Sequence, residues 1–132
     1  MTRNTEILLS NTGKKISVIG EKVRGNAWYN VKNNLNTIEI LFTNFKGRVG
    51  IQCTLEKNPE ENDWFPIYLN TTKEFIESPD ANGIILNGKK VFHFKGNFMW
   101  IRAIMDRNNI SHPINENNVQ LFGFINRILL LK

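Results

Sequence analysis

At 132 residues, the chain has the length of one domain, which we expect to span residues 1–132, and its hydrophobic fraction of 41% suffices for one core. No apolar run reaches the roughly 18 residues of a transmembrane helix, and the N-terminus lacks the long apolar stretch of a signal peptide, so we expect no membrane partner. The formal net charge is +5, and the single cysteine excludes an internal disulfide.

The N-terminal part of the chain predicts two short strands and then an aromatic segment. Residues 6–10 and 15–19 have strand patterns, and the glycine-containing segment 11–14 between them predicts a hairpin turn. Residues 27–31 predict an aromatic strand or a wide loop.

Two strands in the middle of the chain alternate apolar and polar residues, which is the period of a half-buried strand. The first covers residues 36–43 and the second residues 48–55. Cys53 lies in the apolar phase, so we expect a buried thiol and a chain made in a reducing compartment. The residues that we expect to be buried on these strands are Ile38, Ile40, Phe42, Val49, Ile51, Cys53 and Leu55.

After the second strand, the chain becomes polar and acidic before strand patterns return. Residues 57–63 carry a proline and predict a loop. Residues 64–70 predict a strand, which Pro66 confines to a strand start or a sheet edge because proline has no amide hydrogen to donate. Residues 74–77 are the one place where a helical turn is conceivable.

The C-terminal half of the chain predicts a hairpin and further strands. Residues 83–86 and 90–94 flank Asn87-Gly88, which is a strong hairpin signal. The remaining segments are a second central strand, a polar loop and a closing strand or strand pair, at residues 98–106, 107–118 and 119–132.

About nine strands, frequent turn signals and no convincing helix predict an all-β fold. Within this class we expect an antiparallel β-sandwich that is jelly-roll-like.

Two segments of the chain contain related motifs in a fixed order. The motif residues are Phe45-Lys46-Gly47, Asp63-Trp64-Phe65, Phe94-Lys95-Gly96-Asn97 and Trp100-Ile101-Arg102-Ala103. Over residues 45–105 this combination resembles a group of small virion structural proteins of tailed bacteriophages. The resemblance implies a place in a tail, baseplate, neck or capsid decoration, and no chemistry. It also implies that other virion proteins are partners and that the protein, made in the host cytoplasm, resides in the virion.

No constellation of residues points to catalysis, so we expect no enzymatic activity, no cofactor and no metal site. His93 and His112 are the only histidines and Cys53 is the only thiol, which leaves no zinc-ligand spacing. The acidic residues within 60–63 lack the alternating ligands and central glycine of a calcium loop. A paired-carboxylate hydrolase stays open, although nothing in the sequence favours it.

Charge is unevenly spread along the chain. Residues 56–80 hold two basic and seven acidic residues, whereas the segments on either side are basic. Such a bipolar surface suits head-to-tail contacts between copies, so we expect a homo-oligomer with contacts at residues 10–13, 60–64 and the last five residues. The interface candidates are Trp28, Tyr29, Glu60, Glu61, Asp63, Trp64, Arg102, Leu129, Leu130 and Leu131.

Two of these candidates lead to specific expectations. Arg102 lies between apolar residues, so we expect its guanidinium to stack on an aromatic ring and to pair with Asp63. Residues 128–131 are all large and apolar, so the last strand is either central in a sheet or covered by another chain. From this we expect deletion of residues 129–132 to weaken assembly more than the fold.

Two other functions stay open. Jelly-roll sandwiches often bind sugars through exposed aromatic residues, and Trp28 and Tyr29 would suit a carbohydrate-binding module. The sequence pI of about 9.5 permits nucleic-acid binding through the basic and aromatic residues 92–100. The same aromatic residues equally suit a core, so nucleic acid is not an expected partner.

Overall fold

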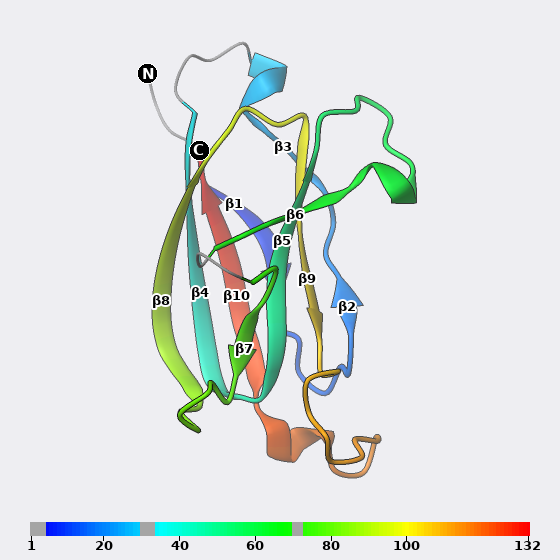
Figure 1. The fold of residues 1–132 in the computed structure, drawn as a ribbon, viewed down its shortest axis with the longest axis vertical. Helices are drawn as coiled ribbons and strands as arrows, with labels where there is room; N and C mark the ends of the chain where they lie inside the picture. Colours follow the sequence, from blue (N-terminus) through cyan, green and yellow to red (C-terminus); the bar gives the residue numbers. More distant parts are fainter. Residues whose placement is uncertain (1–4, 30–33, 70–72) are drawn as a thin grey trace.

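The computed structural model describes residues 5–29, 34–69 and 73–132. Two antiparallel sheets pack face to face, so the fold is the expected all-β sandwich (Figure 1). The described residues form ten strands and three short 3-10 turns. The turns are η1 (Asn26–Tyr29), η2 (Glu61–Asp63) and η3 (Val119–Phe122).

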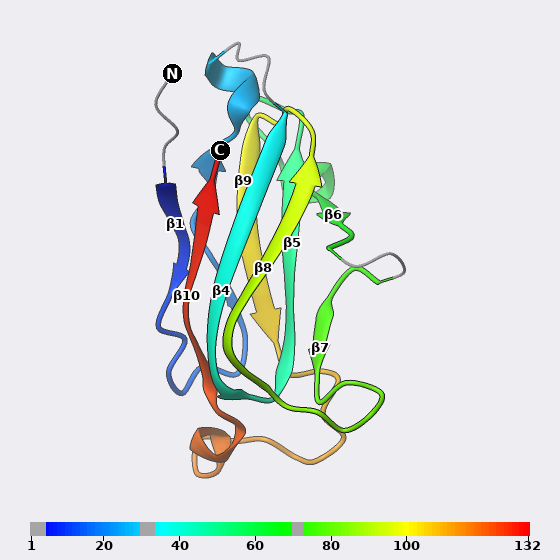
Figure 2. The ribbon, with the colours of Figure 1, turned by 90° about the vertical axis from the view of Figure 1, so that its left-hand side faces the viewer.

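The first sheet, here called sheet A, has the strand order β1-β10-β4-β8 and faces the viewer in Figure 2. Its strands are β1 (Thr5–Ser10), β10 (Phe124–Leu131), β4 (Leu35–Phe45) and β8 (Leu86–Lys95). The second sheet, sheet B, has the order β2-β9-β5-β6, with β3 also paired to β9 and β7 to β5. Its strands are β2 (Val18–Ile19), β3 (Val23–Arg24), β9 (Trp100–Asp106), β5 (Gly47–Thr54), β6 (Phe65–Ile67) and β7 (Ile76–Ser78).

The core lies between the sheets and contains most of the side chains that the strand periodicity predicts. The two central alternating strands are β4 and β5, and the cysteine thiol of β5 is fully buried. Burial raises the pKa of the Cys53 thiol far above its ordinary value, because the thiolate would lose its hydration. The predicted core residues that are buried are Ile38, Ile40, Phe42, Val49, Ile51 and Cys53.

Leu55 is an exception, since 63% of its surface is exposed. The strand β5 ends at Thr54, whose carbonyl accepts a hydrogen bond from the amide of Met99 at 2.9 Å and whose hydroxyl accepts one from the amide of Glu56 at 3.1 Å. The chain therefore turns out of the sheet before Leu55 reaches the core.

The predicted hairpin at residues 6–19 is wrong. The strand β1 pairs with β10 in sheet A, whereas β2 pairs with β9 in sheet B. The amides of Asn11 and Thr12 continue along β10 by donating to the carbonyls of Asn126 and Ile125. The chain then crosses to the other sheet, where Val18 of β2 packs against the core and Ile19 stays exposed.

The hairpin predicted at Asn87-Gly88 is also wrong, since both residues lie within β8. Gly88 has φ +85°, and the pairing register between β4 and β8 shifts between Phe42 and Phe45. The Asn87 Oδ1 accepts a hydrogen bond from the amide of Asn44 at 3.0 Å. The Asn-Gly pair therefore supports an irregularity in a long strand, where a glycine tolerates positive φ, and does not reverse the chain.

Two further segments differ from expectation. The helical turn conceivable at residues 74–77 is absent, because Ile76 begins the strand β7 and is buried against β5. The aromatic segment at residues 27–31 contains the end of η1, and its last two residues lie outside the described part of the chain.

Candidate functional site

Arg102 is the centre of a cluster on sheet B that contains several interface candidates. It lies on β9 with 8% of its surface exposed. Its Nε donates to Gln52 Oε1 at 2.8 Å, and its Nη2 donates to Glu61 Oε1 at 2.8 Å. The guanidinium lies 4.1 Å from the centre of the Trp64 ring. The expected aromatic stacking and acidic pairing both occur, but the carboxylate is that of Glu61 and not that of Asp63.

The turn η2 explains this choice of partner. Asp63 Oδ2 accepts a hydrogen bond from the amide of Glu60 at 2.7 Å, so the Asp63 carboxylate caps its own turn. Glu61 projects from the same turn toward Arg102, although 75% of its side chain stays exposed. The hydrogen bond and the charge of Arg102 lower the pKa of the Glu61 carboxyl.

A shallow pocket of about 250 Å³ adjoins this cluster. Both signs of charge line it, since Glu21, Glu60 and Glu61 are acidic and Lys22 and Arg102 are basic. Such a surface matches a partner that also carries both charges, and it offers no nucleophile. The pocket is lined by Gly20, Glu21, Lys22, Pro59, Glu60, Glu61, Trp64 and Arg102.

Trp28 and Tyr29 lie in η1, near a group of cations that the sequence reasoning missed. The rings of Trp28 and Trp100 meet edge to face at 5.3 Å. Arg24 lies 4.6 Å and Lys57 5.5 Å from the Trp28 ring centre. Because its ring already has these neighbours, Trp28 is not a free platform for a sugar ring. The cations come from β3 and from the loop after β5, so no local pattern could have revealed the grouping.

Tyr29 is 47% exposed, and the Nζ of Lys132 lies 5.0 Å from its ring centre. The Lys132 Nζ also lies 2.8 Å from Glu6 Oε1 and donates to the carbonyl of Arg24. Lys132 is itself buried, so the last residue fastens the end of β10 to β1 and β3.

The C-terminal strand β10 is central in sheet A, between β1 and β4. Leu130 is fully buried and belongs to the core, so it is not an interface residue. Leu129 and Leu131 point to the opposite, outer face and are half-buried. The expectation that deletion of residues 129–132 weakens assembly more than the fold is therefore wrong, because the deletion removes Leu130 from the core and the central pairing of β10.

The outer face of sheet A carries a row of side chains that crosses all four strands. In this row Ile7 pairs with Leu129, Leu129 with Glu39, and Glu39 with Val91. Ile7 is 60% and Val91 50% exposed. We call these four residues the sheet A row. A contiguous exposed apolar patch marks a surface that another molecule covers, whereas singly exposed apolar residues are ordinary. Here the two exposed apolar residues, Ile7 and Val91, lie on the edge strands β1 and β8, with Leu129 and Glu39 between them.

At the opposite end of the sandwich from η2, the loop from β9 to η3 meets the turn between β4 and β5 (Figure 1). Arg107, the residue after β9, is buried there. Its guanidinium donates to the carbonyls of Lys15, Lys46, Phe122 and Gly123 at 2.7–3.3 Å. It forms no ion pair among the described residues. Burial lowers the pKa of Arg107, since the charge has lost its water. The sequence reasoning missed this residue because its partners are backbone atoms from distant loops.

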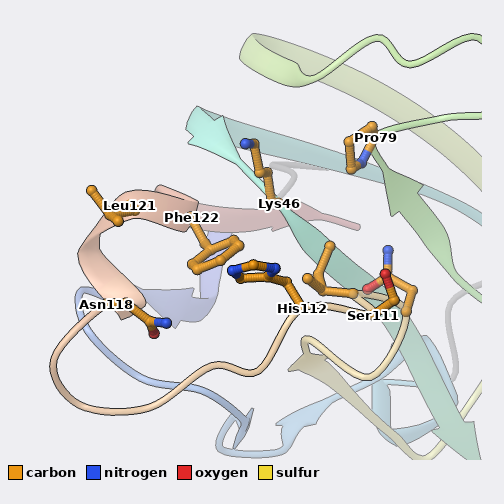
Figure 3. Close-up of a pocket in the computed structure, with 9 residues that line it drawn as sticks. Lys46, Pro79, Ser111, His112, Asn118, Leu121 and Phe122 are labelled. Atoms are coloured by element: carbon orange, nitrogen blue, oxygen red, sulfur yellow. The ribbon is translucent and has the colours of Figure 1, made fainter.

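Next to Arg107 lies a pocket of about 530 Å³, shown in Figure 3. His112 and Phe122 lie ring to ring in it, with 6.5 Å between their centres. Lys46 extends beside them, 5.8 Å from the Phe122 ring centre. The pocket is lined by Lys46, Pro79, Asn109, Ile110, Ser111, His112, Asn118, Leu121 and Phe122.

The described part of the chain offers no arrangement for metal binding, since no three His, Cys, Asp or Glu side chains gather there. His93 lies on β8, where its Nδ1 is hydrogen-bonded to Thr37 Oγ1 at 3.0 Å. His112 lies in the loop between β9 and η3. No helical segment among the described residues is long and apolar enough to span a bilayer.

No protein-family model matches this chain, and no curated protein or solved structure is significantly similar to it.

Proposed function

We propose that this protein is a non-enzymatic structural component of a tailed-phage particle, in a tail, baseplate, neck or capsid decoration. In this proposal it acts through contacts with copies of itself and with neighbouring virion proteins. The sheet A row carries the proposal, because it leaves Ile7 and Val91 largely exposed on the open face of sheet A. The resemblance of residues 45–105 to small virion proteins supports the same function.

The sheet A row is suited to pairing with an identical face. Glu39 lies in the row between two cations, with its Oε1 3.6 Å from Lys89 Nζ and 3.7 Å from Arg127 Nη2. The face thus presents apolar groups together with both signs of charge, and two such faces can match each other across a two-fold axis. A specific contact of this kind needs to bury at least about 1,000 Å² in total.

We further infer a jelly-roll connectivity. The chain passes repeatedly from one sheet to the other, and the orders β1-β10-β4-β8 and β2-β9-β5-β6 place the first and last strands side by side. This arrangement supports the description, since a jelly roll folds two Greek keys into two facing sheets. Jelly rolls are frequent in particle shells and also in carbohydrate-binding domains.

Carbohydrate binding through Trp28 and Tyr29 is the second candidate. The geometry favours it less, because the Trp28 ring is packed against Trp100 and two cations.

The proposal predicts that the purified protein forms oligomers that depend on the sheet A row. Ile7→Lys with Val91→Lys should yield a monomer in size-exclusion chromatography with light scattering, because two exposed apolar groups become charges. Its thermal midpoint should match that of the wild type, since both side chains point away from the core. Ile84→Lys is the control, because Ile84 is 62% exposed but lies in a loop outside the sheet.

Mass spectrometry of purified particles from the host that carries this sequence tests the remaining part of the proposal. Detection of the protein in those particles is the expected result. A wild-type protein that stays monomeric and is absent from the particles would contradict the structural assignment.

A further inference from the structure

The pocket in Figure 3 has the size and wall construction of a small-molecule site. Its volume of about 530 Å³ falls within the range of roughly 300–1,000 Å³ that ligand sites occupy. Three separate segments contribute to it: the turn between β4 and β5, the residue after β7, and the loops from β9 to η3.

The walls of the pocket are held in place by hydrogen bonds. The amide of Lys46 donates to the carbonyl of Phe122 at 2.7 Å. Arg107 Nη1 donates to the carbonyls of Lys46 and Phe122, at 2.7 and 2.8 Å. Asn109 Nδ2 donates to the carbonyls of Gly47 and Ser78, at 3.0 and 3.2 Å. A site whose walls are already fixed loses little conformational freedom when it binds.

A close backbone approach fixes η3 as well. Gly123 follows η3 with φ +65°, and a Cβ at this position would lie 2.1 Å from the carbonyl oxygen of Asn44. Only glycine fits there, so the residues that end η3 are held against the end of β4.

The charge in and behind this pocket is positive. Lys46 is half-buried and makes no ion pair among the described residues, and none of the residues that line the pocket is acidic. The Arg107 guanidinium lies directly behind the wall, bound to the Lys46 and Phe122 carbonyls, and it also has no carboxylate partner among the described residues. Two cations at a partly desolvated site favour an anion.

The rest of the pocket is largely apolar, with polar groups at its margin. The Phe122 ring and Leu121 supply an apolar wall, although 70% of the surface of Leu121 is exposed, and the His112 ring adjoins it at an angle of 41° to the Phe122 ring. Ser111 and Asn118 supply a hydroxyl and an amide. A bare inorganic anion would leave the apolar side chains of Phe122 and Leu121 without contact.

From these observations we propose that the pocket binds a small organic carboxylate borne on a six-membered ring. The carboxylate pairs with Lys46, and the ring lies against Phe122 and Leu121. A sugar acid and an aromatic acid share this chemistry, and they differ in whether the ring carries hydroxyls for Ser111 and Asn118. The proposal is independent of assembly, because the pocket lies at the end of the sandwich and not on the sheet A row.

The test is a titration of the ¹⁵N-labelled full chain with glucuronate, benzoate, glucose and inorganic phosphate, followed by NMR. At least one of the two ring acids should shift the amides of Leu121 and Phe122 saturably, with a Kd on the order of 1 mM for ligands of this size. Glucose and phosphate should each bind about tenfold more weakly, because one lacks the charge and the other lacks the ring. The ring acid that binds more tightly identifies the source.

Two variants and one control locate the binding. Lys46→Met should lower the affinity for the ring acid by about tenfold, because it removes one charge-assisted hydrogen bond. Leu121→Ser should lower the same affinity severalfold, and the protein should stay folded because Leu121 is exposed. Lys95→Met removes an exposed lysine on β8 and should bind like the wild type.

The proposal is overturned if neither ring acid gives saturable shifts, or if glucose or phosphate binds as tightly as the ring acids. It is also overturned if Lys46→Met or Leu121→Ser leaves the affinity unchanged, or if Lys95→Met reduces it as strongly as Lys46→Met does.

Discussion

Arg102 lies on β9 and Arg107 directly follows this strand, and both are buried. Their charges are stabilised in different ways. Arg102 pairs with the Glu61 carboxylate, bonds to Gln52 and stacks on Trp64. Within the described part of the chain, the Arg107 guanidinium donates only to backbone carbonyls. The first arrangement depends on a group that titrates in acid, and the second does not. Acid should therefore loosen the Arg102 cluster while the loops around Arg107 stay fixed.

The Arg102 cluster gives a pH-dependent prediction. The pKa of Glu61 is lower in the folded protein than its ordinary value of 4.5, so the ionised carboxylate stabilises the fold above that pH. This contribution is lost as the pH falls below 4.5 through the lowered folded-state pKa. Glu61→Gln should therefore show less loss of stability than the wild type between about pH 5 and about pH 3 in urea denaturation. The effect should be modest, because Glu61 is exposed.

Glu116→Gln is the control for this measurement, because Glu116 is an exposed carboxylate in the loop before η3. It should follow the wild-type pH dependence. Identical acid sensitivity of Glu61→Gln and the wild type would show that the ion pair does not stabilise the fold. A double-mutant cycle of Arg102→Ala with Glu61→Ala should be strongly non-additive, whereas Arg102→Ala with Asp63→Ala should show a smaller coupling, because Asp63 acts on Arg102 only through the turn that holds Glu61.

Among the elements, β4 and β5 could be predicted from sequence because their burial follows a local period of two. The hairpins could not, because turn chemistry at residues 11–14 and 87–88 says nothing about which sheet each flanking segment joins. That partition is decided by long-range pairing, as when β1 pairs with the last strand of the chain. The alternation of apolar and polar residues also continues past the end of β5, so it wrongly predicts that Leu55 is buried.

In the candidate site, too, the residues with a local signal could be predicted, whereas their long-range partners could not. Trp64 and Arg102 stand out locally, as aromatic and charged residues within apolar runs, and the structure brings them together. Glu61 rather than Asp63 pairs with Arg102 because a three-residue turn sets which carboxylate is free. Lys46 and Arg107 give no local signal, since their surroundings are assembled from loops distant in sequence.

The end of β5 yields a prediction about the element as a whole. Ile51→Ala should cost about 2–5 kcal/mol of unfolding free energy, because Ile51 is fully buried and the substitution leaves a cavity. Leu55→Ala should change it by less than about 0.5 kcal/mol, because Leu55 is already in water. Chemical denaturation at equilibrium compares the two variants. A large cost for Leu55→Ala would mean that the strand continues past Thr54 in solution.

At the scale of the whole molecule, the separation of charge along the sequence is not kept in space. Arg102 and Lys22 lie at the pocket of the acidic loop, and Glu77 pairs with Lys73 within its own segment at 3.6 Å. At the end around Lys46 and Arg107, none of the described residues that line the pocket is acidic, but Asp80 directly follows Pro79, and Asp106, which pairs with Arg48, directly precedes Arg107. Head-to-tail attraction between an acidic and a basic pole is thus less favoured than contact through the sheet A row.

These two modes of assembly respond differently to salt. Exposed charges are screened at high ionic strength, with a Debye length of about 3 Å at 1 M compared with about 10 Å at 0.1 M. Burial of apolar surface is not weakened by salt in this way. An oligomer held by the sheet A row should therefore keep its mass in light scattering between about 0.1 M and about 1 M NaCl. The Ile7→Lys, Val91→Lys variant should be monomeric at both concentrations. An oligomer that dissociates in high salt and survives those two substitutions would instead be held by its charged ends.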